Sequence, residues 1–161
     1  PGSARGVARR VVSGCCHYDF LQYRAGAAWL VMADGSGKSV FGALYMARLS
    51  VQVRTMARHL AGPVELLSGL NRKLYQELEP GMFVTMLAAV LDPETGVMEF
   101  ACAGHPSPLL RAPDGGVSEL SEPGALPLGA MADTAFRAHT VTWAPASRVL
   151  FYTAGLRDAL M

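Results

Sequence analysis

The segment VMADGSGKSV, residues 31–40, holds the residue types from which proteins build a phosphate-binding loop or a metal site. A phosphate-binding loop needs a glycine five positions before the glycine that precedes lysine, because that glycine lets successive N–H groups point at the phosphates. Met32 occupies this position, and the carboxylate of Asp34 would repel the phosphates. The segment therefore does not fit a nucleotide-binding loop.

Asp34 and Gly35 fit a hard cation better. A carboxylate supplies oxygen ligands, and a glycine leaves its own carbonyl oxygen accessible. An Asp-Gly-Ser-Gly sequence is also frequent in ordinary turns, for purely conformational reasons. The local sequence leaves a metal site and a simple turn as open alternatives.

The chain has three cysteines, Cys15, Cys16 and Cys102. Cys16 could ligate zinc together with His17 and Asp19, but a tetrahedral zinc site needs further ligands elsewhere in the chain. The sequence offers no such second pair. An odd number of cysteines without a secretory signal favours the reducing cytoplasm as the location.

Length and composition restrict the class of protein. The 161 residues suffice for one domain with a two-layer core. Hydrophobic residues make up 51% of the chain, yet no apolar run is long enough to span a bilayer. The formal net charge is only +1, which gives no electrostatic basis for binding nucleic acid or an anionic membrane.

The first half of the chain predicts three strands and two helices, which must position these residues. Strands are expected at residues 4–12, 15–23 and 27–33, where β-branched and aromatic residues alternate between turn signals. Apolar residues then recur at intervals of three and four from Ser39 to Leu60, which indicates a long amphipathic helix. Its apolar stripe is expected beneath the sheet, with a homodimer seam as the alternative. Pro63 begins a second helix.

The second half predicts antiparallel strands. The expected strands are residues 82–92, 97–103, 107–112, 117–120, 134–143 and 148–154. Strands, then a helix pair, then further strands indicate an α+β layered fold rather than a doubly wound one. The helix pair covers one face of the sheet, so the remaining apolar surface requires a second sheet or a partner.

Several segments, in chain order, carry a family resemblance: SGCCHYDFLQY, LVMADGSGKSVFGALYMA, LNRKL, MFVTMLAAVLDPETGVMEFACAGHPSPLL, LPLG and LFYTAGLRDA. Together they resemble the metal-dependent protein serine/threonine phosphatases of the PPM type, in the bacterial branch called SpoIIE-like. The resemblance extends over nearly the whole chain. It implies a single domain over residues 1–161, folded as a layered α-β-β-α sandwich whose mostly antiparallel sheets are covered by a long helix pair.

The resemblance also implies the chemistry of the site. Members of this family use two Mn²⁺ or Mg²⁺ ions to activate a hydroxide that attacks phosphoserine or phosphothreonine. By motif, Asp34 takes the place of the metal-bridging aspartate, Gly35 that of the carbonyl ligand, and Asp19 that of a further acidic position. The loop Ser36, Gly37 and Lys38 is expected near the phosphate. His105, in the turn GHP, is expected to be a structural hydrogen-bonding group rather than a general acid.

The departures from the family pattern fall at ligand positions. Cys16 stands where the opening motif has an aspartate, and Ala154 stands where the family writes the aspartate of Tyr-Thr-Asp-Gly-Leu. The last family ligand is expected on a C-terminal segment beyond Met161. A hard dication requires about six oxygens and charge compensation, so weak or absent binding of Mn²⁺ or Mg²⁺ is expected.

Two functional hypotheses follow. The first is a pseudophosphatase or regulatory domain that binds a partner, and the second is an active Mn²⁺- or Mg²⁺-dependent phosphatase with an unusual ligand set. The resemblance implies as partner a regulatory protein phosphorylated on serine or threonine, of the anti-sigma-antagonist type, or an adjacent sensor domain. A fragment that functions only with flanking segments of a longer protein is a third interpretation.

Overall fold

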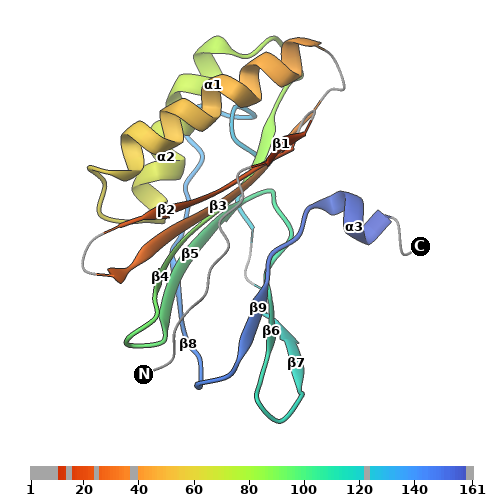
Figure 1. Ribbon diagram of the computed structural model, residues 1–161. Coiled ribbons are helices and arrows are strands. Elements are labelled where there is room, and N and C mark those ends of the chain that lie inside the picture. The colour runs from red at the N-terminus through yellow and green to blue at the C-terminus, as the bar shows by residue number, and fades with distance from the viewer. Residues whose placement is uncertain (1–10, 14–15, 24–25, 37–39, 122–123, 159–161) are drawn as a thin grey trace.

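The computed structural model describes residues 11–13, 16–23, 26–36, 40–121 and 124–158. Two antiparallel sheets and a helix pair form the domain (Figure 1). The larger sheet has six strands in the order β1-β2-β3-β4-β5-β8, and the smaller sheet has three in the order β7-β6-β9. The predicted α+β class with mostly antiparallel sheets is confirmed.

The strands of the larger sheet are β1 (Val11–Ser13), β2 (Cys16–Gln22), β3 (Ala28–Gly35), β4 (Val84–Asp92), β5 (Val97–Ala103) and β8 (His139–Thr142). Those of the smaller sheet are β6 (Leu109–Arg111), β7 (Val117–Glu119) and β9 (Arg148–Leu150). The helices are α1 (Val40–Ala57), α2 (Pro63–Glu77) and the short α3 (Ala154–Asp158).

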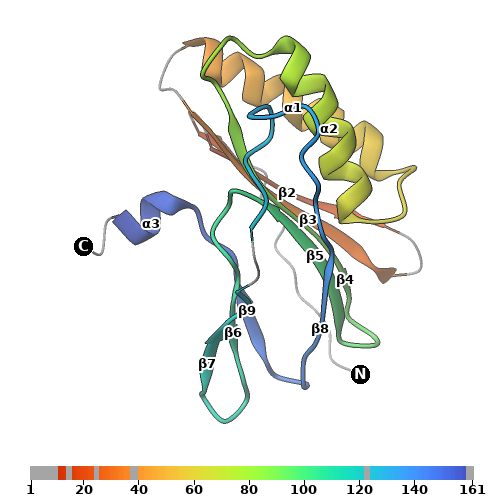
Figure 2. The same cartoon turned by 180° about the vertical axis from the view of Figure 1, so that it is seen from behind.

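The layers follow the predicted division of apolar faces. The pair α1 and α2 covers one face of the larger sheet, and the smaller sheet lies on the opposite side (Figures 1 and 2). A second sheet, rather than a partner, therefore covers β4 and β5 on that side. Beyond the smaller sheet, the described residues include only the five-residue α3, so they do not build the fourth layer of the expected α-β-β-α order.

Alternation along β4 and β5 divides the core into two clusters. Side chains on one face of these strands, such as Met86 and Ala88, pack with buried residues of α1 and α2. Side chains on the other face form the cluster between the sheets, which consists of Leu87, Ala89, Met98 and Phe100. Because both faces are covered, these strands are mostly apolar, and their polar residues are Thr85, Asp92 and Glu99.

The helical stripe predicted from Ala43 to Leu60 is confirmed as core. Its members Met46, Ser50, Val53 and Ala57 are buried, and those at its two ends are partly buried. They pack within this chain, so the alternative of a dimer seam along the stripe is wrong. Helix α2 begins at Pro63, as predicted, where a missing N–H costs no helical hydrogen bond.

Some strands are shorter than predicted. The residues Pro106 and Pro108 lack the N–H that a ladder needs, so β6 begins only at Leu109. The strand predicted at 134–143 pairs with β5 only from His139 onward, because Ala125 takes the place beside Ala103. Of the strand predicted at 4–12, residues 4–10 lie outside the described residues.

Candidate functional site

The predicted bridging aspartate, Asp34, lies near the end of β3 and directly opposite Cys16 of β2. Residues paired in this way point to the same face of a sheet. The thiol of Cys16 donates a hydrogen bond to Asp34 Oδ1 over 3.3 Å. The fold thus brings together the two positions that the family resemblance assigned to metal ligands, with a thiol in place of the first carboxylate.

Gly35 and Ser36 continue the chain beyond Asp34. Gly35 is the last residue of β3 and pairs with Val84 of β4. Ser36 exchanges two hydrogen bonds with Phe83: its N–H donates to the Phe83 carbonyl over 2.9 Å, and its Oγ accepts from the Phe83 N–H over 2.8 Å. These bonds hold the start of the loop against β4. Gly37 and Lys38, expected near a phosphate, lie outside the described residues.

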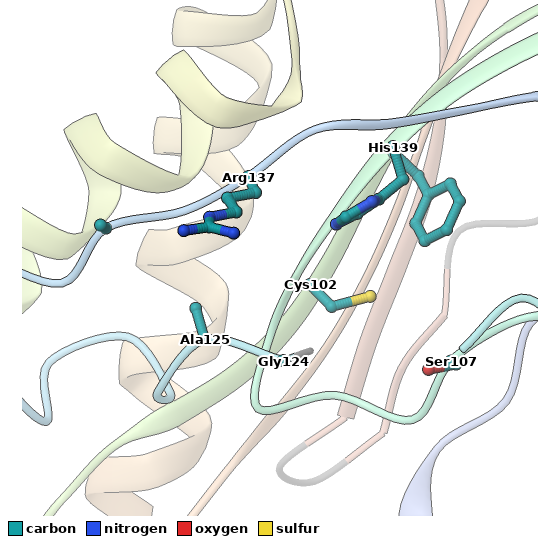
Figure 3. Close-up of a pocket in the computed structure, with 8 residues that line it drawn as sticks. Cys102, Ser107, Gly124, Ala125, Arg137 and His139 are labelled. Carbon is teal, nitrogen blue, oxygen red and sulfur yellow. The ribbon is translucent and has the colours of Figure 1, made fainter. Parts of the chain in front are cut away.

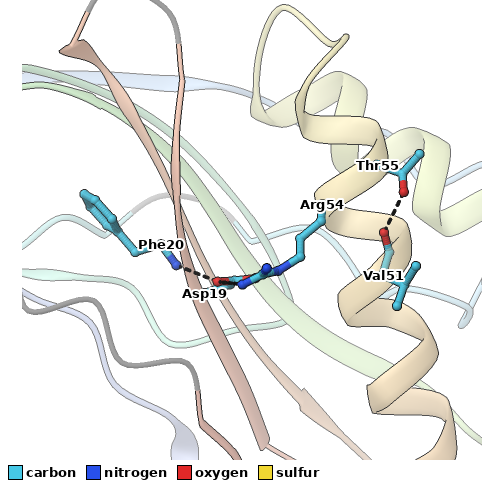
Figure 4. Close-up of polar contacts among 5 residues, drawn as sticks. All are labelled: Asp19, Phe20, Val51, Arg54 and Thr55. Atoms are coloured by element: carbon cyan, nitrogen blue, oxygen red, sulfur yellow. Dashed lines mark hydrogen bonds and ion pairs between the residues drawn. The ribbon is translucent and has the colours of Figure 1, made fainter.

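Asp19 lies on the other face of β2, against the helices. It pairs in register with Val31, whose side chain is fully buried in the cluster beneath α1 and α2. The carboxylate of Asp19 is 3% exposed and accepts two hydrogen bonds from the guanidinium of Arg54, over 2.6 and 2.8 Å (Figure 4). The structure therefore corrects the expectation that Asp19 ligates a metal beside Asp34.

The alternation of a strand explains this placement. Side chains three residues apart, such as Cys16 and Asp19, point to opposite faces of a strand, so only one of them can face Asp34. Arg54, which sequence reasoning missed, lies one position after the buried Val53 of α1. A buried carboxylate on the helix side requires a cation as partner, so a basic residue on α1 could have been predicted from the burial of Asp19.

His105 connects Asp34 to the C-terminal part of the chain. Its Nδ1 lies 3.1 Å from Thr85 Oγ1, and the Thr85 hydroxyl in turn lies 3.3 Å from the backbone carbonyl of Asp34, to which it donates. These contacts join the FVTM and GHP segments of the family resemblance. The His105 ring is buried beside the backbone of Tyr152, which supports the structural role predicted for it.

Burial lowers the pKa of His105 to about 4 from its usual 6.5, although the backbone of Tyr152 and the charge of Asp34 act in the opposite direction. Because the folded-state pKa lies below that of the unfolded chain, the neutral ring stabilises the fold fully above about pH 6.5. This contribution is lost as the pH falls toward 4, and amounts to about 3 kcal/mol at most.

We therefore expect the free energy of unfolding to fall between pH 6.5 and 4 more steeply in the natural chain than in a His105→Asn variant. The asparagine keeps a polar group near Thr85 but does not titrate. Urea denaturation at several pH values measures the difference. Parallel pH profiles for the two proteins would contradict the assigned cause.

Ala154, the second degenerate ligand position, begins α3 directly after the segment that packs near His105. The Tyr152 backbone thus lies at the same end of the sandwich as Asp34. The family resemblance expects a metal ligand from this segment at that end. A methyl group, however, cannot coordinate a cation. The side chain therefore leaves that coordination position without a donor.

The donor set does not fit a two-metal centre. Asp34 is the one carboxylate of the predicted set on this face, and the described part of the chain contains no group of three or more His, Cys, Asp or Glu side chains able to hold a metal ion. A thiol is also a soft ligand, whereas Mn²⁺ and Mg²⁺ prefer oxygen. No catalytic step through bound metal ions follows from these residues.

The sequence is similar to that of known proteins over most of its length. The sequence model of the family described as Stage II sporulation protein E (SpoIIE) matches residues 24–160. Phosphoserine phosphatase RsbP of Bacillus subtilis (strain 168) is 24% identical over 146 residues, which cover 88% of this chain and 35% of RsbP.

Two solved structures share the fold. The RsbU and RsbW domains of Rv1364c from Mycobacterium tuberculosis align with a TM-score of 0.80 and 30% identity, over 91% of this chain and 40% of that one. The PP2C phosphatase domain of SpoIIE from Bacillus subtilis aligns with a TM-score of 0.78 and 13% identity, over 94% of this chain and 46% of that one. The chain thus spans less than half the length of these relatives.

Proposed function

The chain belongs to the SpoIIE family of PPM-like serine/threonine phosphatase domains, and we propose that it is a degenerate member that binds a regulatory partner without dephosphorylating it. The proposal takes residues 1–161 as one domain and places it in the cytoplasm. Within the described residues, none of the helices combines the length and apolar character of a bilayer-spanning segment.

The observation that carries the proposal is the state of Asp34. Its carboxylate accepts a hydrogen bond from the Cys16 thiol, and Cys16 occupies the position where the family resemblance expects a second carboxylate. Two-metal hydrolysis lowers the pKa of a bound water from 15.7 to about 7, and this requires dications held by several anionic oxygens. One carboxylate with a neutral thiol provides at most one such negative charge.

The partner we propose is a regulatory protein phosphorylated on serine or threonine, of the anti-sigma-antagonist type. RsbP, the similar protein from Bacillus subtilis, is a phosphoserine phosphatase, which supports this class of partner. In this proposal the partner binds at the surface around Asp34 and Ser36, where the family resemblance expects the phosphate. An adjacent sensor domain on a longer chain is the other partner of the same proposal.

One observation favours the alternative of an active enzyme. The Cys16 thiol and Asp34 Oδ1 lie only 3.3 Å apart and point at each other, so a cation could replace the shared proton. A thiolate and a carboxylate would then both contact that ion. In that case, activity would depend on a softer metal than Mg²⁺.

A phosphatase assay separates the two functions. With para-nitrophenyl phosphate and a phosphoserine peptide in excess Mn²⁺ or Mg²⁺, we expect the natural chain to hydrolyse either substrate no faster than an Asp34→Ala variant. Asp114→Ala, which removes an exposed carboxylate from a distant turn, is the matched control. Hydrolysis at least about tenfold above Asp34→Ala, equal in the control, would establish turnover and overturn the proposal.

A further inference from the structure

A pocket of about 290 Å³ opens between the larger sheet and the connections that cross its β8 edge (Figure 3). Phe100 and Cys102 of β5 and His139 of β8 contribute from the sheet. The connections contribute Ser107, Gly124, Ala125, Ala135 and Arg137. Asp34 lies two strands away on β3, so this pocket is separate from the candidate metal site.

The described lining of the pocket includes a basic side chain, Arg137, but no acidic one. Arg137 is exposed and makes no ion pair or hydrogen bond with any described residue. Its guanidinium points into the same space as the ring of His139 (Figure 3). None of the described residues that line the pocket carries a carboxylate. An unpaired guanidinium facing such a space favours an anion, and its planar fork binds phosphate or carboxylate through two parallel hydrogen bonds.

Ser107 and Cys102 add neutral donors of hydrogen bonds to the pocket. The Ser107 hydroxyl lies on the side of the pocket opposite Arg137 (Figure 3). Burial raises the pKa of the Cys102 thiol to about 12, so at neutral pH it forms a neutral wall and does not repel an anion. Among the described lining residues, Arg137 is therefore the one with a permanent charge, and that charge is positive.

The remaining lining consists of small residues and two aromatic rings. Ala125 and Ala135 contribute methyl groups, and the ring of His139 packs on Phe100 with centroids 5.6 Å apart. A volume of about 290 Å³ lies just below the usual range for small-molecule sites, roughly 300 to 1,000 Å³. The size fits a molecule with a single ring and one anionic group.

A neighbouring pocket of about 470 Å³ shares Phe100 and His139 and continues along β8. Glu119 lines this second pocket, so its carboxylate disfavours an anion there. The two pockets thus differ in charge, because Arg137 lines the first and Glu119 the second. An anionic group is therefore directed to the pocket at Arg137.

We propose that the pocket at Arg137 binds a small organic anion, with a phosphate or carboxylate group on the guanidinium and a flat apolar body between His139 and the alanine methyl groups. This ligand is a second one, independent of the partner proposed for the Asp34 surface. It bridges β8 to the connections at residues 124–125 and 135–137. Its binding therefore stabilises the folded domain by an amount that rises with the logarithm of ligand concentration once this exceeds Kd.

Titration of the domain with phenyl phosphate and with benzoate, followed by ¹⁵N–¹H correlation spectra in EDTA, tests the proposal. We expect saturable shifts at the amides of Ser107, Gly124, Ala125 and Ala135 with at least one of these probes. The probe that binds tells whether the anionic group is phosphate or carboxylate. Arg137→Gln should weaken binding at least about tenfold, because it removes a charge-assisted hydrogen-bond pair.

Two matched variants isolate the pocket. Arg111→Gln removes an exposed guanidinium from β6, and Glu119→Gln removes the carboxylate of the neighbouring pocket. Neither should weaken binding. Overturning results are the absence of saturation by either probe, shifts centred on Asp34 rather than on the pocket, or equal losses in Arg137→Gln and Arg111→Gln.

Discussion

Replacing Cys16 and Ala154 together with aspartate should create a Mn²⁺ site that binds at least about a hundredfold more tightly than the natural chain. Affinities of dication sites range from about 10⁻⁹ to 10⁻³ M with the number of charged ligands and the rigidity of the site. The Cys16 position already faces Asp34 Oδ1 at 3.3 Å, so an aspartate there would place two carboxylates side by side. Isothermal titration calorimetry measures the gain.

The same double variant should be less stable than the natural chain when no metal is present. Cys16 and Asp34 are directly opposite in register, and like charges at such positions repel each other. Mn²⁺ should then raise the melting temperature of the variant and not that of the natural chain. Adding Asp34→Ala to the double variant is the control and should abolish the gain. A folded double variant that binds Mn²⁺ no better than the natural chain would contradict the assignment of these ligand positions.

Replacing Arg54 with methionine should cost about 3 to 5 kcal/mol of folding free energy, because it leaves the buried carboxylate of Asp19 without its charge partner. Asp19 is 3% exposed and accepts two hydrogen bonds from the Arg54 guanidinium, so the loss of Arg54 leaves it the single bond from the Phe20 N–H among its described donors. For a domain of this size, the loss corresponds to a fall in melting temperature of roughly 6 to 20 °C. Thermal and urea denaturation measure it.

Arg48→Met is the matched control on the same helix. Arg48 pairs with Glu77 over 2.8 Å, but its side chain is 57% exposed, so its loss should cost under about 1 kcal/mol. Adding Asp19→Asn to Arg54→Met should recover part of the stability, since it removes the stranded charge. Equal costs for Arg54→Met and Arg48→Met would show that the ion pair of Asp19 and Arg54 contributes no more stability than an exposed one.

Periodicity predicted most of the fold because the core has regular faces. The stripe of α1 and the alternation of β4 and β5 reflect burial against one or two layers, and this burial imposes periods of about 3.6 and 2 on the sequence. The ends of β8 were predicted poorly. The strand starts late because a distant residue, Ala125, occupies the position beside Ala103. The local sequence does not predict such a long-range pairing.

The candidate site was predictable only in part. Motif order located Asp34 and Cys16, and the register of β2 and β3 then brought them together. The same motif wrongly suggested Asp19, because the spacing of residues does not by itself reveal which face of a strand meets the helices. Its partner Arg54 is 35 positions away in the chain, and the pairing arises only when α1 packs on the sheet.

The most direct test of the degenerate site is a calorimetric titration of the natural domain with Mn²⁺, beside Asp34→Ala. We predict that neither protein binds Mn²⁺ at concentrations up to about 1 mM, the weak limit of physiological dication sites, while circular dichroism shows both to be folded. Micromolar binding by the natural chain that disappears in Asp34→Ala would contradict the prediction. It would show that Asp34 still holds a metal ion.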